Sequence, residues 1–470
     1  MSARSPYALH AWYPAVRAAA RAYRVLGEDA APGRRAVESA WAEVAPGGAL
    51  VIVDRPRSRI GRFLRLGRRA RARGLAQGLA GASRIDRWLA LPGTGGSGVL
   101  LPTSRDGFTA GARLLPAGRR RWRLARRLLT ALAWAGLAER LGFDVLLVAV
   151  RGAAGGPRVP WVAECADSDA TVALGVPGAF RKAVVLVSGR RGTVRGLLKL
   201  PVTSASRENV RREADALERL AELPGDAAPA PALLARAEAG DVPWLVQAFV
   251  DGRRSPEALG AAHFAFLADL RRRTAVERDL EDLGVFRSAC ARLDALRDGT
   301  EREWHAALAA LRDAVRRWFA EAPVPCCMAH GDFTPWNLLL VSGRLVAFDW
   351  ELAEEEAPAL FDLIHFHFQT GILVRHLAAP ALLEELDAVV AGAGRPLLRS
   401  FGLRPAAVDA LAGLHVLHAA TLDEAANRVE RPPFAQVDWL RSARLELARR
   451  LVRRLAGGAR EPVSGLEAAA

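Results

Sequence analysis

The sequence has very little lysine and cysteine, and both shortages limit what the protein can be. Of its 66 basic residues only Lys182 and Lys199 are lysines, so arginine carries almost all of the formal charge of +15. The four cysteines show neither C-x-x-C nor Cys/His ligand spacing. This pattern argues against a zinc site and against a disulfide framework, and it favours a reducing, cytoplasmic location.

Long apolar runs are also missing. A transmembrane helix needs roughly 18 or more consecutive apolar residues, and the best candidate, 130–150, contains Glu139, Arg140 and Asp144. We therefore expect no transmembrane segment. Hydrophobic residues make up 51% of the 470 positions and charged residues 25%, which is typical of a folded chain. At about 150 residues per domain, this length has room for two or three domains.

The excess of positive charge indicates an acidic partner in principle. However, arginine clusters such as 119–127 are most often solvated helix faces, and no aromatic platform or recognised nucleic-acid motif accompanies them. We therefore expect no specific nucleic-acid partner. A basic nucleic-acid-binding module is kept as an alternative, and salt-dependent retention on DNA tests it.

The most informative stretch is 328–351, MAHGDFTPWNLLLVSGRLVAFDWE. Its apolar run 338–341 predicts a strand. Ser342 and Gly343 predict a hairpin turn, and 345–348 then forms the returning strand. Three polar side chains therefore converge at the open end of this hairpin, namely Asp332, Asn337 and Asp349.

Two carboxylates and an amide are what phosphoryl transfer requires. One carboxylate orients and deprotonates the acceptor, and oxygen ligands hold Mg²⁺ on the nucleotide phosphates. Asp332 stands where the catalytic-loop Asp stands in H-R-D-x-x-x-x-N, Asn337 where its Asn stands, and Asp349 where the Asp of D-F-G stands. The variant wording, His-Gly-Asp and Asp-Trp-Glu, resembles the aminoglycoside phosphotransferase and choline kinase family. The alternative is a surface hairpin that carries three polar residues.

The resemblance extends over about 165–455 and implies an α+β, two-lobed protein-kinase-like fold. A small β-rich nucleotide-binding lobe is expected at 161–250 and a helical catalytic and acceptor lobe at 251–456, followed by a disordered tail at 457–470. Residues 1–155 are expected to form an N-terminal α/β region of uncertain fold.

A Gly- and Pro-rich linker at 151–160 is expected to separate the N-terminal region from the lobes. Within that region WAEVAPGGALVIVDRP resembles a late strand of a class I methyltransferase. No G-x-G-type loop precedes it, so this segment would be a remnant that cannot bind S-adenosylmethionine.

In the nucleotide lobe, strands are predicted at 171–174, 182–187 and 193–200. Lys199 lies inside the last of them, where a charge is costly without a partner. Glu213 lies beside an apolar helical stripe in 208–220 and is the expected partner. In the kinase arrangement such a pair orders the contact to the nucleotide phosphates. The alternative is an edge-strand lysine whose amine reaches solvent.

Four further residues of this lobe are expected to contact nucleotide. Gly175 and Gly178 lie in the turn where a kinase-like lobe covers the phosphates with backbone N–H groups, although an ordinary hairpin is the alternative. The stretch WLVQAFV resembles the strand that ends in the hinge, so Gln247 and Phe249 would offer backbone groups to adenine.

The helical lobe is predicted to contain helices at 262–274, 277–297 and 301–319. Asp362 follows Asp349 by thirteen residues and resembles the family's helix-borne acid, which accepts hydrogen bonds from the catalytic-loop backbone. The alternative is an acid favoured by the helix dipole. His365 and His367 face different sides of a helix, so they do not form a metal pair.

The resemblance implies an ATP- or GTP-dependent phosphotransferase that uses Mg²⁺. Asp332 and His330 would be catalytic, and Asn337 and Asp349 would bind the metal. The acceptor would be the hydroxyl of a small molecule of the aminoglycoside, choline or sugar type. A catalytically inactive nucleotide-binding pseudokinase that scaffolds other proteins is the alternative. The sequence leaves the oligomeric state open.

Overall fold

The computed structural model describes most of the chain after residue 168 and separate parts before it. The described residues are 23–26, 34–46, 48–54, 79–82, 84–92, 98–112, 144–151, 169–174, 180–189, 191, 193–224, 229–239, 242–297, 301–429 and 437–457, with five positions between 124 and 131. Contacts divide the chain into a β-rich unit, Met1–Arg211 with Leu233–Phe249, and a helical unit, Arg212–Ala232 with Val250–Ala470. The second boundary lies one residue from the predicted end of the nucleotide lobe.

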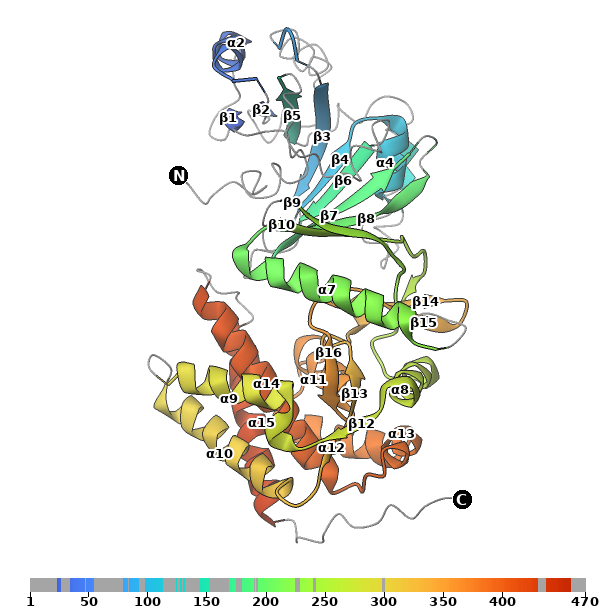
Figure 1. Ribbon diagram of the computed structural model, residues 1–470, viewed down its shortest axis with the longest axis vertical. Coiled ribbons are helices and arrows are strands. Elements are labelled where there is room, and N and C mark those ends of the chain that lie inside the picture. The colour runs from blue at the N-terminus through green and yellow to red at the C-terminus, as the bar shows by residue number, and fades with distance from the viewer. Residues whose placement is uncertain are drawn as a thin grey trace. The chain divides into compact units, whose positions relative to one another are not determined.

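The β-rich unit is built on one sheet, in which the described strands follow the order β1-β2-β5-β3-β4-β6-β7-β8-β10-β9 (Figure 1). Only β1 and β2 pair in parallel, and all other described neighbours are antiparallel. The strands are β1 (Tyr23–Leu26), β2 (Ala49–Asp54), β3 (Arg84–Pro92), β4 (Gly98–Pro102), β5 (Asp144–Val150), β6 (Asp169–Leu174), β7 (Lys182–Ser188), β8 (Val194–Pro201), β9 (Leu233–Ala239) and β10 (Val242–Gln247).

Three of these strands confirm the predictions made for the nucleotide lobe. β6, β7 and β8 contain the predicted runs at 171–174, 182–187 and 193–200 to within one residue. In β7 and β8 most Val, Leu and Ala side chains are buried, in near-continuous runs. Such runs are expected for strands that are covered on both faces.

Strands from both sides of the predicted linker at 151–160 belong to one sheet. β4, which precedes the linker, pairs with β6, which follows it, so that Gly98 lies opposite Leu174 and Leu100 opposite Val172. The chain before the linker therefore supplies the neighbouring strand of β6. The linker itself, apart from Arg151, lies outside the described residues.

A short helix from the same N-terminal region covers this junction. α4 (Arg105–Gly111) begins at Ser104, whose hydroxyl accepts the N–H of Gly107 at 3.1 Å, and it packs on β4, β6 and β7. A Cβ atom at Gly111 would lie 2.2 Å from the hydroxyl of Thr171, so this close approach requires glycine. The Asp106 carboxylate also accepts the backbone N–H of Arg191 at 2.9 Å.

The far end of the sheet has its own small core. α2 (Arg34–Ala42) packs Val37 and Trp41 against Leu50 and Ile52 of β2 and Leu147 of β5. The helix and the buried strand agree with the α/β pattern expected for this region. The methyltransferase resemblance of the segment stays a prediction.

The helical unit consists mainly of packed helices, and four of them, α9, α10, α14 and α15, contact one another (Figure 1). None of the described helices is long and apolar enough to cross a membrane. The helices are α8 (Ala261–Thr274), α9 (Gly284–Ala295), α10 (Arg302–Trp318), α11 (Phe361–Leu373), α12 (Ala379–Ala391), α13 (Arg395–Ser400), α14 (Ala407–Val429) and α15 (Val437–Gly457). α7 (Ser204–Glu222), predicted at 208–220, runs across the division between the units.

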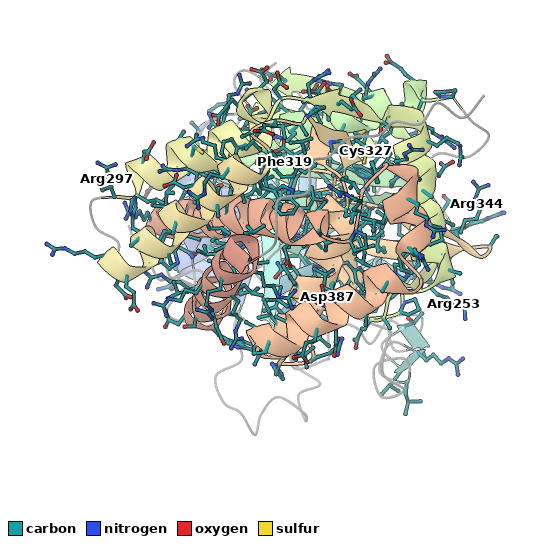
Figure 2. The ribbon with its side chains drawn as sticks, turned by 90° about the horizontal axis from the view of Figure 1, so that it is seen from below. Arg253, Arg297, Phe319, Cys327, Arg344 and Asp387 are labelled. Carbon is teal, nitrogen blue, oxygen red and sulfur yellow. The ribbon has the colours of Figure 1, made fainter. Side chains whose placement is uncertain are left out.

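Apolar residues at helical spacing explain the packing of the bundle. Trp304, Leu308, Leu311 and Val315 of α10 are all buried, because positions three and four apart share one helix face. Arg297, which follows α9, and Arg344 are exposed and point away from the helices in Figure 2. Solvated arginines of this kind agree with the interpretation of the charge excess as surface composition.

The prediction of one helix over 277–297 is wrong at its start. β12 (Val276–Arg278) is a strand, the 3₁₀ turn η6 (Leu280–Asp282) follows it, and α9 begins only at Gly284. β12 pairs with β13 (Val324–Ala329), placing Val276 opposite Cys326. A pairing partner so far along the chain overrides the local helical periodicity. β16 (Glu354–Pro358) completes this sheet on the other side of β13.

Candidate active site

The candidate site is built on the loop and hairpin that follow β13. The turn η7 (Pro335–Asn337) leads into β14 (Leu338–Val341), which pairs with β15 (Arg344–Ala347). Ser342 and Gly343 have φ values of 49° and 83°, and positive φ at both central residues is the requirement of the tightest hairpin turn. The predicted hairpin is therefore confirmed.

Gly331 allows the loop to pass close to the chain that returns from the hairpin. Its φ is +81°, and a Cβ atom there would lie 1.9 Å from the backbone oxygen of Leu352. No other residue type fits this position without moving the backbone. The glycine of His-Gly-Asp is thus required by the local fold.

Asp332 is held by Asn337 from within the same loop. The Asn337 amide nitrogen Nδ2 donates to the Asp332 carboxylate oxygen Oδ2 at 2.8 Å and to the Asp332 backbone oxygen at 3.0 Å. The Asp332 side chain keeps 30% of its surface exposed, so it can meet a molecule from outside. A partly exposed carboxylate in a defined orientation is suited to accept a proton.

His330 is buried, and its ring is hydrogen-bonded to the loop and to the end of the hairpin. Its Nε2 lies 3.0 Å from the Phe348 backbone oxygen, and its Nδ1 accepts the Asp332 backbone N–H at 3.2 Å. The carbonyl oxygen can only accept, so Nε2 carries the hydrogen of this neutral ring. The ring lies 4.7 Å from that of buried Trp350. Completely covered, His330 reaches no molecule outside the protein.

Asp349 is joined to this loop through its neighbour. The Phe348 backbone N–H donates to the Asn337 backbone oxygen at 3.0 Å, which holds the start of Asp349 beside the turn that carries Asn337. Asp349 itself has φ of 73°, in the left-handed region that aspartate tolerates better than most residues. Unusual backbone conformations of this kind often occur at functional sites.

Asp362, in the first turn of α11, holds the loop that carries Asp332. Its two carboxylate oxygens accept the backbone N–H groups of His330 at 2.7 Å and Gly331 at 3.0 Å. The resemblance predicts contacts of this kind for Asp362. Burial raises the pKa of this carboxyl, while the two backbone N–H donors act in the opposite direction.

Asn337 and Asp349 carry oxygen atoms of the kind that magnesium prefers as ligands. Both hydrogens of the Asn337 amide are committed to Asp332, so its oxygen Oδ1 is the atom that could face a metal, together with the Asp349 carboxylate. Within the residues that the structure describes, no three His, Cys, Asp or Glu side chains form a metal cluster. One amide and one carboxylate suit Mg²⁺, which usually takes few protein ligands and completes its shell with phosphate oxygens and water.

The nucleotide-binding candidates of the β-rich unit belong to neighbouring strands. Lys199 is 3% exposed and lies opposite Val184 on β7 and Leu245 on β10. Gln247 at the end of β10 is buried as well, and Phe249 follows it, half-buried.

The structure says less about the remaining nucleotide-binding candidates. Glu213, on α7, is completely buried, and its pairing with Lys199 stays a prediction. Gly175 and Gly178 lie outside the described residues.

Sequence reasoning missed two histidines behind Asp332. His365 Nε2 lies 3.1 Å from Asp332 Oδ1, and His365 Nδ1 lies 3.1 Å from Nε2 of His415 on α14. One signal was present in the sequence: His365 follows Asp362 by three residues and therefore shares its helix face. His415, fifty residues farther along, offered none.

Part of the chain matches the model of a known protein family. Residues 174–406 match the model of the phosphotransferase enzyme family, and this range contains the candidate residues described above except His415. No curated protein matches the chain significantly.

Comparison with solved structures finds similar chains at low sequence identity. A thermostable mutant of aminoglycoside phosphotransferase APH(4)-Ia is 15% identical, with 63% of this chain and 99% of that chain covered and a TM-score of 0.44. A choline/ethanolamine kinase family protein from Mesorhizobium loti is 18% identical, with 60% and 91% covered and a TM-score of 0.40. The choline kinase LicA from Streptococcus pneumoniae is 12% identical, with 58% and 90% covered and a TM-score of 0.39.

Proposed function

Because residues 174–406 of the chain belong to the phosphotransferase enzyme family, we propose that the protein transfers the γ-phosphoryl group of ATP or GTP to a hydroxyl of a small molecule. The observation that carries this proposal is the accessible carboxylate of Asp332, which Asn337 holds in one orientation. A backbone hydrogen bond between Phe348 and Asn337 joins the start of Asp349 to the same loop. The acceptor would be of the aminoglycoside, choline or sugar type, as is usual for the family.

Asp332 acts as the base in this proposal. It orients the acceptor hydroxyl and accepts its proton, so that the acceptor oxygen can form a bond to the γ-phosphorus. The bond from this phosphorus to the bridging oxygen breaks, and the nucleoside diphosphate leaves. Its orientation depends on Asn337 and on the loop geometry that Gly331 permits. The sequence places His330 with the catalytic residues, but its ring is buried and hydrogen-bonded to the backbone of Phe348 and Asp332, so we assign it a positioning role.

Asn337 Oδ1 and the Asp349 carboxylate would hold Mg²⁺. The bound ion would offset the negative charge of the phosphate oxygens.

Lys199 would place a positive charge near the phosphates, with Glu213 holding its amine in place. Gln247 and Phe249 would offer backbone groups to the base, and Gly175 and Gly178 backbone N–H groups to the phosphates. Asp362 would keep the loop backbone in place.

The test is Mg²⁺-dependent transfer from labelled ATP or GTP to a panel of aminoglycosides, choline and other amino alcohols, and sugars. Asp332→Asn should lower turnover by at least about 10²-fold, as expected for loss of a general base, and keep the Mg²⁺-dependent stabilisation by nucleotide in a thermal melt. Asp349→Asn should lose both. Asparagine also tolerates left-handed φ, so this change removes the charge without straining residue 349.

Asp294→Asn is the matched control, because Asp294 is an exposed carboxylate on α9 with only a distant ion-pair partner. It should change neither turnover nor nucleotide binding. Full turnover in both active-site variants would overturn the proposed function. Nucleotide binding by the wild-type protein without transfer to any acceptor would instead support the pseudokinase alternative.

A further inference from the structure

Two buried histidines extend the candidate site into the core of the helical unit. Asp332 on the loop, His365 on α11 and His415 on α14 form a continuous hydrogen-bonded row, with 3.1 Å at each of its two links. His365 and His415 are 7% and 3% exposed. The row therefore begins at a carboxylate that a substrate can reach and ends in the protein interior.

The partners determine which ring nitrogens carry hydrogen. A carboxylate that serves as a base is ionised and can only accept, so His365 Nε2–H donates to Asp332 Oδ1. In neutral His365, Nδ1 is then an acceptor, and His415 Nε2–H must donate to it. This leaves His415 Nδ1 without a hydrogen, and that atom is buried with no hydrogen-bond partner among the residues that the structure describes. A bare ring nitrogen is tolerated there far better than an unbonded N–H would be.

The surroundings of His415 keep its ring neutral, as this assignment of hydrogens to the ring nitrogens requires. Its ring contacts Phe361 and Phe368 edge-on, at 5.0 and 5.9 Å between ring centres. Burial lowers its pKa well below the ordinary value, and the nearby positive or titratable groups, His365, Arg444 and His418, act in the same direction. A neutral His415 can donate from only one nitrogen, so it selects one tautomer of His365.

The row also completes the restraint on the carboxylate. Asn337 binds one oxygen of Asp332 and His365 binds the other, so the carboxylate plane cannot rotate without breaking one of the two bonds. A general base contributes most when its lone pair is aimed at the proton before the reaction starts.

We propose that His365 and His415 are positioning residues for the phosphoryl transfer proposed above: His365 fixes the orientation of the Asp332 carboxylate, and His415 fixes the tautomer of His365. Neither touches the nucleotide or the acceptor. Their effect belongs to the chemical step and leaves nucleotide binding unchanged. The expected effect on catalysis rests on the proposed function, whereas the positions of the ring hydrogens can be tested without any activity.

The first test is spectroscopic and uses the full chain labelled with ¹⁵N-histidine. The His365 ring should show hydrogen on Nε2 and none on Nδ1, and His415→Leu should remove this preference. A His365 ring with hydrogen on Nδ1 would overturn the proposal. This readout does not depend on turnover, so an inactive wild-type protein would refute the proposed function without deciding the hydrogen-bond order.

The second test is kinetic, with the acceptor found in the screen or, before one is known, with water as acceptor for MgATP. His365→Leu should lower kcat about 10- to 100-fold, the cost of a misaligned catalytic group, with KM for ATP unchanged. His365→Gln should recover most of the loss, because the glutamine amide can donate in place of Nε2. His415→Leu should have a smaller effect of the same kind.

His367→Leu is the control for simple loss of a buried histidine. His367 lies on the same helix, is 4% exposed and has Nε2 2.8 Å from the backbone oxygen of Leu382, away from Asp332. It should lower the melting temperature at least as much as His365→Leu and leave kcat unchanged. Equal loss of kcat in both leucine variants, or no recovery with His365→Gln, would show that the row serves only folding.

Discussion

The two units assemble their candidate functional residues in different ways. In the helical unit, Asp332, Asn337 and Asp349 come from one loop and one hairpin, and the bonds among them join residues close in sequence. In the β-rich unit, Lys199 and Gln247 are aligned by a sheet whose strands come from distant parts of the chain. The first arrangement depends on turn geometry and the second on long-range strand pairing. Substitutions in the turns should therefore disrupt the first, and the loss of neighbouring strands should disrupt the second.

The largest effect is expected from removing the N-terminal region. A fragment 161–470 loses β4 and α4, leaving the edge of β6 unpaired and one face of β6 and β7 uncovered. Exposed edges and apolar faces favour aggregation. The fragment should therefore aggregate or lose protection from hydrogen exchange in β6 to β8. A monomeric fragment that keeps the full-length protection and binds MgATP would instead establish residues 1–155 as a separate domain, as the sequence predicts.

The second prediction concerns the turn geometry of the helical unit. Gly331→Ala must resolve a contact of 1.9 Å with the Leu352 backbone at a positive φ, which should cost about 2–4 kcal/mol in unfolding free energy and abolish turnover. Urea unfolding and the transfer assay measure the two effects. Gly343→Ala is the matched control, because φ there is +83° but nothing lies within 4 Å of the added Cβ, so about 1 kcal/mol is expected. Equal losses would show that steric fit at Gly331 is unimportant.

The third prediction is that acid destabilises the helical unit more than the β-rich unit. Eight of the nine histidines lie between residues 263 and 418, and burial lowers the pKa of His367 and His415, and that of His418 to about 3. Because the folded pKa lies below the unfolded value of about 6.5, the stability that these groups contribute is complete above pH 6.5. It is lost as the pH falls from there toward the folded pKa.

At pH 5 the loss should be about 2 kcal/mol for each fully buried histidine. Hydrogen exchange at pH 7 and pH 5, corrected for intrinsic rates, should therefore show weakening in α11 and α14 while β6 to β8 change little. His367→Gln should reduce the pH dependence. Uniform weakening of both units would mean that buried histidines do not dominate the acid response.

The smallest expected effect tests whether α4 supports the β-rich unit. Ser104→Ala removes the side-chain oxygen that accepts the Gly107 N–H, and the loss of such a cap costs about 1 kcal/mol. The change should lower protection in β6 and β7 and leave α11 unaffected. Thr109→Ala, which removes a hydroxyl bonded within the same helix to Arg105, should have little effect. A change confined to residues before 112 would indicate that α4 is not coupled to the lobe.

Much of the candidate site could be predicted from the sequence because its chemistry is local. The hairpin turn at Ser342 and Gly343 and the strands on each side follow from neighbouring residues. The convergence of Asp332 and Asn337 depends on a few turn residues between them. The strands β6, β7 and β8 were equally readable, because continuous apolar runs of this length bounded by turns rarely form anything else.

The tertiary structure decided what depends on distant partners. Residues 276–278 have helical periodicity but form a strand because β13 offers a pairing edge. Residues 98–112 join the nucleotide lobe because β6 has an edge to pair and a face to cover. The row from Asp332 through His365 to His415 exists only because α11 and α14 pack together. Periodicity and spacing report interactions within a few residues, whereas these three outcomes depend on contacts between segments 30 or more residues apart, which no local pattern encodes.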